Sequence, residues 1–258
     1  MLVLGDSFVW CWGVEIAECF TERLEAVLPD TDVINTGVPA WSTAQEMLFY
    51  EREGRRYASD VVLLVFVPND PVENVRGWGP RFRLDGDRLV ATNVPVPRRK
   101  GALGEWLQAR SRLYAEVTYR LAVAREALRY VGARGRPTAP PPAVAAEAAY
   151  VPAAPPRTSP AWAVTAALLD RLSGDVTRDG ARFAVAAEEM PPAMAIWLRD
   201  LLAAHGIPYV ELAPALVAAA RRGERVRLSP DPHLAPAGQR VVAETLAVFL
   251  AERGLLAR

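Results

Sequence analysis

Two residue types that could transfer a proton between them stand near opposite ends of the chain. Ser7 directly follows an apolar run and Gly5, and His233 lies in the Pro-rich stretch DPHLAP. A serine hydroxyl is a poor nucleophile until a base takes its proton, and an imidazole suits that role near neutral pH. Asp231 precedes His233 by two residues, and Pro232 biases it towards extended backbone, in which side chains at i and i+2 point the same way. We therefore expect Asp231 to orient the imidazole and stabilise its charged form.

Few other residues could bind a metal or a cofactor. His205 is the only other histidine, and it stands before Gly206 at an expected helix end, which explains it without a catalytic role. The two cysteines share one early segment, and no Gly-rich phosphate loop is present. We therefore expect neither a metal site nor a nucleotide cofactor.

Apolar strand-like runs alternate with helix-like patterns along the chain. Strands are expected at 1–4, 31–35, 61–67, 182–187 and 208–212. Helices are expected at 21–28, 42–54, 192–205 and 236–253, the second of them with Ser42 and Glu46 as N-terminal signals. This alternation predicts an α/β fold, a doubly wound parallel sheet flanked by helices.

Four short polar features follow expected strands or precede the last helix. They are Gly5-Asp6-Ser7, Asn35-Thr36-Gly37, Asn69-Asp70 and Asp231-Pro232-His233. In open α/β sheets, ligands bind at the carboxyl edge of the strands, so we expect these four features to converge there.

A stretch from about 72 to 160 interrupts the alternation. Residues 82–90 predict a hairpin turning at Asp85-Gly86, and apolar residues between 114 and 128 recur at helical spacing. Residues 134–160 form a Pro/Ala-rich linker. We expect one domain over residues 1–258 with this stretch inserted, either covering the site or packing as a structural excursion.

The four features together resemble the GDSL/SGNH hydrolase superfamily, which is named for a Ser, a Gly, an Asn and a His in four blocks. Ser7, Gly37, Asn69 and His233 match these positions, over roughly residues 1–75 and 180–250. The resemblance implies a flavodoxin-like hydrolase fold. It also implies an oxyanion hole made by the backbone N–H of Ser7, the backbone N–H of Gly37 and the side-chain amide of Asn69.

Two positions depart from the family pattern. Val67 stands where the third block usually carries glycine, and the last block has Asp-x-His in place of the commoner Asp-x-x-His. The short spacing is similar to that of relatives resembling bacterial polysaccharide O-acetyltransferases, which keeps acyl transfer open as a reaction.

The resemblance implies a serine-dependent carboxylic ester hydrolase that acts through an acyl-enzyme, with Ser7 as nucleophile and His233 as base and then acid. One alternative is an O-acyltransferase that passes the acyl group to a sugar or natural-product hydroxyl. An alternative from another class is a binding module of this fold without turnover.

Composition limits the partners. Thirty basic and thirty acidic residues cancel, which argues against a nucleic-acid groove, and the longest apolar run is too short to span a membrane. The expected substrate is a small-molecule ester or an acylated carbohydrate or lipid. The sequence does not indicate the oligomeric state. Trp10, Trp12, Trp41 and Trp78 follow the site segments closely and either line a substrate pocket or belong to the core.

Cys11 and Cys19 are eight residues apart. On one helix their Cα atoms would lie about 12 Å apart, too far for a disulfide, so we expect two free thiols, which favours the cytoplasm. No basic segment with an apolar core precedes the first strand, and that strand starts so near Met1 that a segment upstream of this chain is left open.

Overall fold

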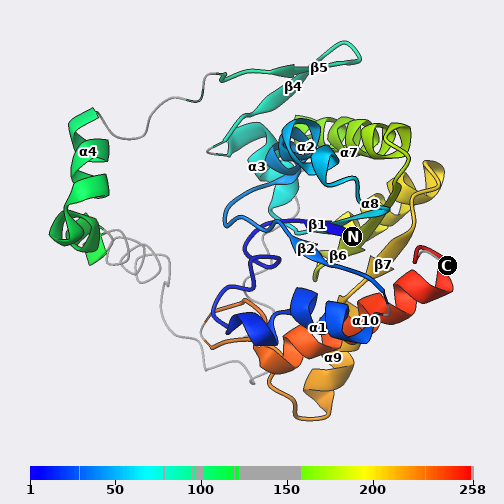
Figure 1. The fold of residues 1–258 in the computed structure, drawn as a ribbon. Helices are drawn as coiled ribbons and strands as arrows, with labels where there is room; N and C mark the ends of the chain where they lie inside the picture. Colours follow the sequence, from blue (N-terminus) through cyan, green and yellow to red (C-terminus); the bar gives the residue numbers. More distant parts are fainter. Residues whose placement is uncertain are drawn as a thin grey trace, which may run out of the picture. The chain divides into compact units, whose positions relative to one another are not determined.

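A parallel sheet lies at the centre of the computed structural model (Figure 1). Within the described residues it has five strands in the order β2-β1-β3-β6-β7. The strands are β1 (Leu2–Leu4), β2 (Ile34–Asn35), β3 (Val61–Phe66), β6 (Arg182–Ala187) and β7 (Tyr209–Glu211). The strand order reverses beside β1, and in such sheets the ligand crevice opens at that point, outside the carboxyl ends of the strands. The doubly wound α/β class expected from the sequence is confirmed.

The structure describes residues 1–28, 30–77, 79–94, 96, 102–118, 120–121, 158–229 and 231–256. The chain divides into one unit of residues 1–94 and 149–258 and another of residues 95–148. The first unit holds the sheet, and the second holds α4 (Ala102–Arg110) and the helical residues 112–118. Most of the expected Pro/Ala-rich linker lies outside the described residues.

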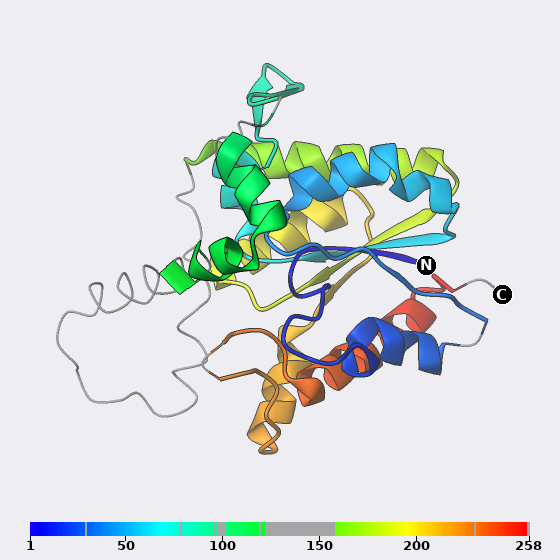
Figure 2. The same cartoon turned by 60° about the vertical axis from the view of Figure 1, so that its left-hand side comes forward.

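Helices cover both faces of the sheet (Figure 2). On one face lie α2 (Thr43–Arg52), α3 (Asp70–Arg76), α7 (Pro160–Arg178) and α8 (Pro192–Ala204). On the other face lie α1 (Phe20–Val27), α9 (Ala213–Arg221) and α10 (Pro236–Glu252). None of the helices in the described ranges is both long enough and apolar enough to cross a bilayer.

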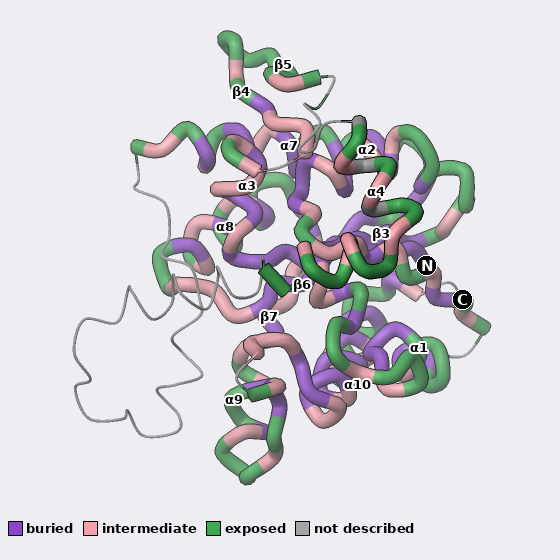
Figure 3. Tube along the Cα trace, turned by 90° about the vertical axis from the view of Figure 1, so that its left-hand side faces the viewer, coloured by how far each residue is buried: buried purple, intermediate pink, exposed green. Residues whose placement is uncertain are grey.

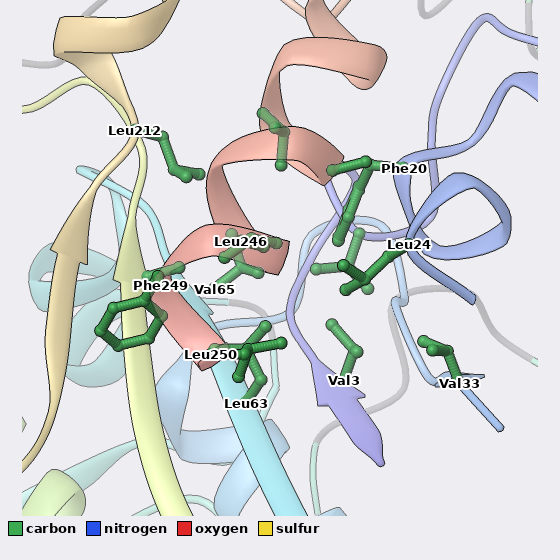
Figure 4. Packing of buried hydrophobic residues seen from close by; sticks show 14 of the residues in the cluster. Val3, Phe20, Leu24, Val33, Leu63, Val65, Leu212, Leu246, Phe249 and Leu250 are labelled. Carbon is green, nitrogen blue, oxygen red and sulfur yellow. The ribbon is translucent and has the colours of Figure 1, made fainter. Parts of the chain in front are cut away.

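The strands separate two hydrophobic clusters because successive side chains point to opposite faces. Leu63 and Val65 of β3 pack with α1 and α10, among residues such as Leu24 and Leu246 (Figure 4). Val62, Leu64 and Phe66 pack towards α2, α7 and α8. Every residue of β3 is buried, as Figure 3 shows for the centre of the sheet. The continuous apolar run 61–67 therefore reflects a strand covered on both faces.

The inserted stretch contains elements that belong to the first unit. The expected hairpin forms as β4 (Phe82–Asp85) and β5 (Arg88–Ala91), which pair antiparallel, with Gly86 at a φ of 60° in the turn. Helix α7 begins at Pro160, inside the expected linker, because Ser159 caps it by accepting a hydrogen bond from the backbone N–H of Ala161.

The expectation of two free thiols is wrong, since a disulfide joins Cys11 and Cys19 with their Cα atoms 5.4 Å apart. The expectation assumed a single helix. Instead, Cys11 has a φ of 59° and Gly13 a φ of 82°, so the chain turns back before the short 3-10 helix Ile16–Glu18. Because the two cysteines are not free thiols, they do not favour the cytoplasm.

Candidate active site

Ser7, His233 and Asp231 form a continuous chain of hydrogen bonds. The Nε2 atom of His233 lies 2.7 Å from the Ser7 Oγ, and the Nδ1 atom lies 2.5 Å from the Asp231 Oδ1. A carboxylate can only accept, so Nδ1 carries the proton, and Nε2 is then free to accept the hydrogen of the Ser7 hydroxyl. This is the geometry that a base needs in order to take a proton from a serine.

A tight turn at the end of β1 fixes Ser7. The Oδ1 atom of Asp6 accepts a hydrogen bond from the backbone N–H of Phe8 at 2.9 Å. A Cβ on Gly5 would come within 2.3 Å of the Val9 side chain, so only glycine lets the turn close against Val9. The residues around Ser7 are thus held by packing and by a buried carboxyl.

His233 lies in a loop that an isolated β-bridge closes shortly before α10. Arg227 and Leu234 form that bridge, and the backbone N–H of Leu228 donates to the His233 carbonyl at 2.8 Å. The rings of Phe8 and Trp12 lie 4.9 and 6.1 Å from the His233 ring, centroid to centroid. The imidazole therefore has aromatic neighbours from the segment that carries Ser7.

The three residues expected to hold an oxyanion follow three adjacent strands. Ser7 comes after β1, Gly37 after β2 and Asn69 after β3, so the sheet order brings all three to one carboxyl edge. The Asn69 side chain hydrogen-bonds the carboxyl group of Glu73, one turn along α3.

Gly37 is set by close backbone approach. A Cβ at this position would lie 2.2 Å from the Trp10 backbone nitrogen, so glycine is required. Its N–H donates to the Asn35 Oδ1 at 3.0 Å, and the Asn35 Nδ2 donates in turn to the Val9 carbonyl at 2.6 Å. The Gly37 N–H is thus engaged within the protein and can reach a substrate oxygen only by sharing or leaving Asn35.

Buried carboxyl groups lie next to these turns. Asp6 is 4% exposed, and burial raises its pKa to about 7. Burial, and then the neighbouring carboxyl groups, raises the pKa values of Glu46 and Asp70 well above their usual range. In the described part of the chain, neither carboxyl oxygen of Glu46 has a hydrogen-bond partner, and no three acidic, His or Cys side chains are arranged to hold a metal ion. Burial and the neighbouring carboxyl groups thus favour the protonated forms of Glu46 and Asp70.

Glu46 was missed as a buried residue because the sequence suggested an exposed N-terminal signal. The capping box of α2 forms instead between Ser42 and Gln45, and Glu46 is 1% exposed. Its spacing from Met47 and Tyr50, which are both buried on α2, is the signal that could have placed it on the inner face.

A groove of about 400 Å³ opens beside Gly37 and the disulfide. Trp10, Val14 and Ile16 contribute apolar wall, and the exposed Glu22 contributes a carboxylate. Trp10 is 56% exposed and belongs to this groove. Of the expected pocket residues, Trp10 is thus available to a ligand beside the site.

Other candidates lie elsewhere or are not described. The Trp41 ring packs against Phe49 of α2, with centroids 5.7 Å apart. Trp78 is outside the described residues. At the end of α8, His205 lies 3.1 Å from the Asp170 carboxylate, measured from its Nδ1 atom to the Oδ1 atom. That contact accounts for His205 in structural terms.

Neither a family model nor a curated protein matches the chain. Solved structures do match over nearly its whole length. The psychrotrophic esterase EstA from Pseudoalteromonas sp., in a structure inhibited by monoethylphosphonate, has a TM-score of 0.55 and 9% identity, covering 98% of this chain and 96% of its own. A protein described as lipolytic and of the G-D-S-L family, from Desulfitobacterium hafniense DCB-2, has a TM-score of 0.53 and 9% identity, covering 96% and 98%.

A two-domain esterase, CEX, which is active on acetylated mannans, has a TM-score of 0.50 and 12% identity over 98% of this chain and 48% of its own. At these identities the likeness concerns the fold. The chain has the α/β fold of the G-D-S-L lipolytic proteins and related esterases.

Proposed function

We propose that this chain is a serine-dependent hydrolase of carboxylic esters that works through an acyl-enzyme. The observation that carries the proposal is the unbroken contact from Ser7 through His233 to Asp231 at the carboxyl edge of the sheet. A serine, an imidazole and a carboxylate in this arrangement activate the hydroxyl for attack on an acyl carbon.

In the first half of the reaction, the Ser7 Oγ attacks the ester carbonyl while the His233 Nε2 takes its proton. Asp231 stabilises the imidazolium that forms, and the imidazolium then protonates the departing alcohol. In the second half, His233 takes a proton from water as the water oxygen attacks the acyl carbon. The imidazolium then gives that proton to the Ser7 Oγ as the bond between the acyl group and Ser7 breaks, which releases the acid and restores the free enzyme.

The carbonyl oxygen becomes negative in both halves and needs donors that are already in place. The backbone N–H of Ser7, the Asn69 amide and the Gly37 N–H are the donors proposed for it. Because the Gly37 N–H donates to the Asn35 side chain in this structure, its contribution requires the oxyanion to compete with the Asn35 Oδ1.

The comparisons support an ester as substrate. One neighbour in fold is an esterase inhibited by a phosphonate, and another is an esterase active on acetylated mannans. A small acyl group on a carbohydrate or other alcohol is consistent with the half-exposed Trp10 and Trp12 beside the site.

Hydrolysis of p-nitrophenyl esters from acetyl to dodecanoyl tests the proposal, together with covalent labelling by a fluorophosphonate and mapping of the modified residue. We expect turnover and labelling that both vanish in Ser7→Ala. Ser59→Ala is the matched control, because Ser59 precedes β3 at the opposite edge of the sheet. Turnover that survives Ser7→Ala would refute the assignment.

Two other results would redirect the proposal. Labelling of Ser7 with acyl product formed only when an alcohol acceptor is added would identify an O-acyltransferase. A folded protein that is neither labelled nor active on any ester would favour a binding module of this fold.

A further inference from the structure

A buried arginine contacts the loop that carries the proposed base. Arg227 is 8% exposed, and its Nη1 atom donates to the Pro232 carbonyl at 2.7 Å. Pro232 stands between Asp231 and His233. The guanidinium therefore contacts the backbone midway between two members of the proposed triad.

The same guanidinium is anchored to the sheet. Its Nη2 atom lies 3.1 and 3.0 Å from the two carboxyl oxygens of Glu188 and 3.2 Å from the Glu189 Oε2. Glu188 is 4% exposed and directly follows β6, and its backbone N–H donates to the Phe66 carbonyl at the end of β3. Arg227 thus links the His233 loop to the carboxyl edge that also carries Ser7.

Burying this ion pair costs desolvation free energy, which apolar side chains of the same volume would not cost. Burial disfavours the charged form of Arg227, but the carboxylates of Glu188 and Glu189 outweigh it and raise the pKa of Arg227. Buried ion pairs are often no more stabilising than apolar residues of the same volume. The planar guanidinium of Arg227 donates to the Glu188 carboxylate and to the Pro232 carbonyl at the same time, so it can fix the orientation of the loop relative to the sheet.

We propose that Arg227 is a positioning residue, which fixes the Asp231–His233 loop on Glu188 and so sets how His233 meets Ser7. The proposal rests on the proposed function for its effect on turnover, but the placement of the loop can be measured without it. A loss of alignment of about 1 Å at a reacting group is enough to lower a rate about 100-fold.

The test compares Arg227→Lys with the double variant Arg227→Met/Glu188→Leu. Removing Arg227 alone leaves a buried uncompensated carboxylate, which endangers folding, whereas the double variant replaces both charges by apolar side chains. We expect the double variant to fold, with kcat and the rate of Ser7 phosphonylation lowered about 100-fold and KM little changed. The kcat of Arg227→Lys should lie between those of the double variant and the wild type, because one ammonium group cannot contact Pro232, Glu188 and Glu189 as the guanidinium does.

Val242→Ala is the matched control, since it removes buried volume from α10 without touching the loop. Rates are compared per folded molecule, at similar losses of Tm. Wild-type kcat in the double variant, or a loss no larger than that of Val242→Ala, would overturn the proposal.

The proton shared by the His233 Nδ1 and Asp231 gives a second readout that needs no substrate. We expect a low-field NMR resonance in the wild type and in Val242→Ala that is lost or shifted in the double variant. If the wild type proves inactive, the proposed function fails. This resonance still decides the inference, because an unchanged signal in the double variant would contradict it.

Discussion

The Asp231 Oδ1 accepts two hydrogen bonds from His233, one from its backbone N–H at 2.8 Å and one from its Nδ1 at 2.5 Å. The first fixes the backbone between the two residues, and the second fixes the imidazole. The short Asp-x-His spacing thus orients the ring relative to Asp231 through a local turn, and the Arg227 contact with the Pro232 carbonyl ties that turn to Glu188.

Replacing Asp231 by Asn preserves this shape but removes the negative charge and lets the amide donate to Nδ1. We expect Asp231→Asn to fold normally and to lose about 10⁴-fold in kcat for ester hydrolysis, because the imidazole then holds the wrong tautomer. Asp170→Asn is the control, since Asp170 also pairs with a histidine, His205, but away from Ser7. A loss in Asp231→Asn no larger than in Asp170→Asn would contradict this role.

Gly37 and Gly174 should respond to alanine in opposite directions. A Cβ on Gly37 would meet the Trp10 nitrogen at 2.2 Å and the Val9 carbonyl carbon at 2.5 Å, so Gly37→Ala should lower both Tm and kcat. Gly174 lies within α7 with nothing within 4 Å of an added Cβ, so Gly174→Ala should stabilise the protein by up to about 1 kcal/mol. Thermal unfolding and ester hydrolysis check both. Equal Tm values for Gly37→Ala and the wild type would contradict this, because they would show that the backbone of Val9 and Trp10 moves to accommodate the methyl group.

Asp6 should make stability depend on pH. Burial raises its pKa from 3.8 to about 7, so between these values the native state keeps a proton that the unfolded chain loses. The free energy of unfolding therefore loses a contribution as pH rises from about 4 to about 7, by an amount of the order of 4 kcal/mol. Below pH 4 both states are protonated, and above pH 7 the full penalty applies.

Urea unfolding at several pH values tests this for Asp6→Asn, whose amide oxygen can still accept from Phe8. The variant should gain stability relative to the wild type as pH rises towards neutrality. The exposed Asp200→Asn serves as control and should keep a constant difference from the wild type. A constant difference for Asp6→Asn as well would mean that folding does not raise the pKa of Asp6.

The disulfide should stabilise the segment after Ser7. Closing the loop between Cys11 and Cys19, eight residues apart, is worth about 2–3 kcal/mol by the chain-entropy argument. Cys11→Ser/Cys19→Ser should therefore unfold at a lower Tm than the wild type, and reductant should lower the Tm of the wild type alone. Thiol titration of the denatured, unreduced protein should find no free thiol, and two reactive thiols would exclude the bond.

Elements with a strong local signal were predictable from the sequence. The strand Arg182–Ala187 has the expected bounds, and α10 begins at the expected Pro236, because a buried apolar run and a proline at the first helical position are both local features. At the sheet edge, β2 is only Ile34–Asn35, shorter than the expected 31–35, since it pairs with β1 alone.

The features that escaped prediction depend on distant or compensating contacts. A glutamate in the first turn of a helix normally faces water, so the burial of Glu46 was not expected, although its spacing from Tyr50 places it on the inner face of α2. The disulfide depends on the left-handed backbone conformation of Cys11, and nothing in the local sequence predicts that conformation. The link from Arg227 to Glu188 joins residues 39 apart, and neither residue type suggests burial.

Ser7 and His233 are 226 residues apart, and β1 lies inside the sheet between β2 and β3. During synthesis from the N-terminus, the proposed nucleophile is made 226 residues before its base. Such non-local contacts must overcome the entropy of closing a long loop before they contribute stability. The proposed active site therefore exists only once the chain has been made and folded as far as His233, so a nascent chain or one truncated before that residue would carry the serine without the group that activates it.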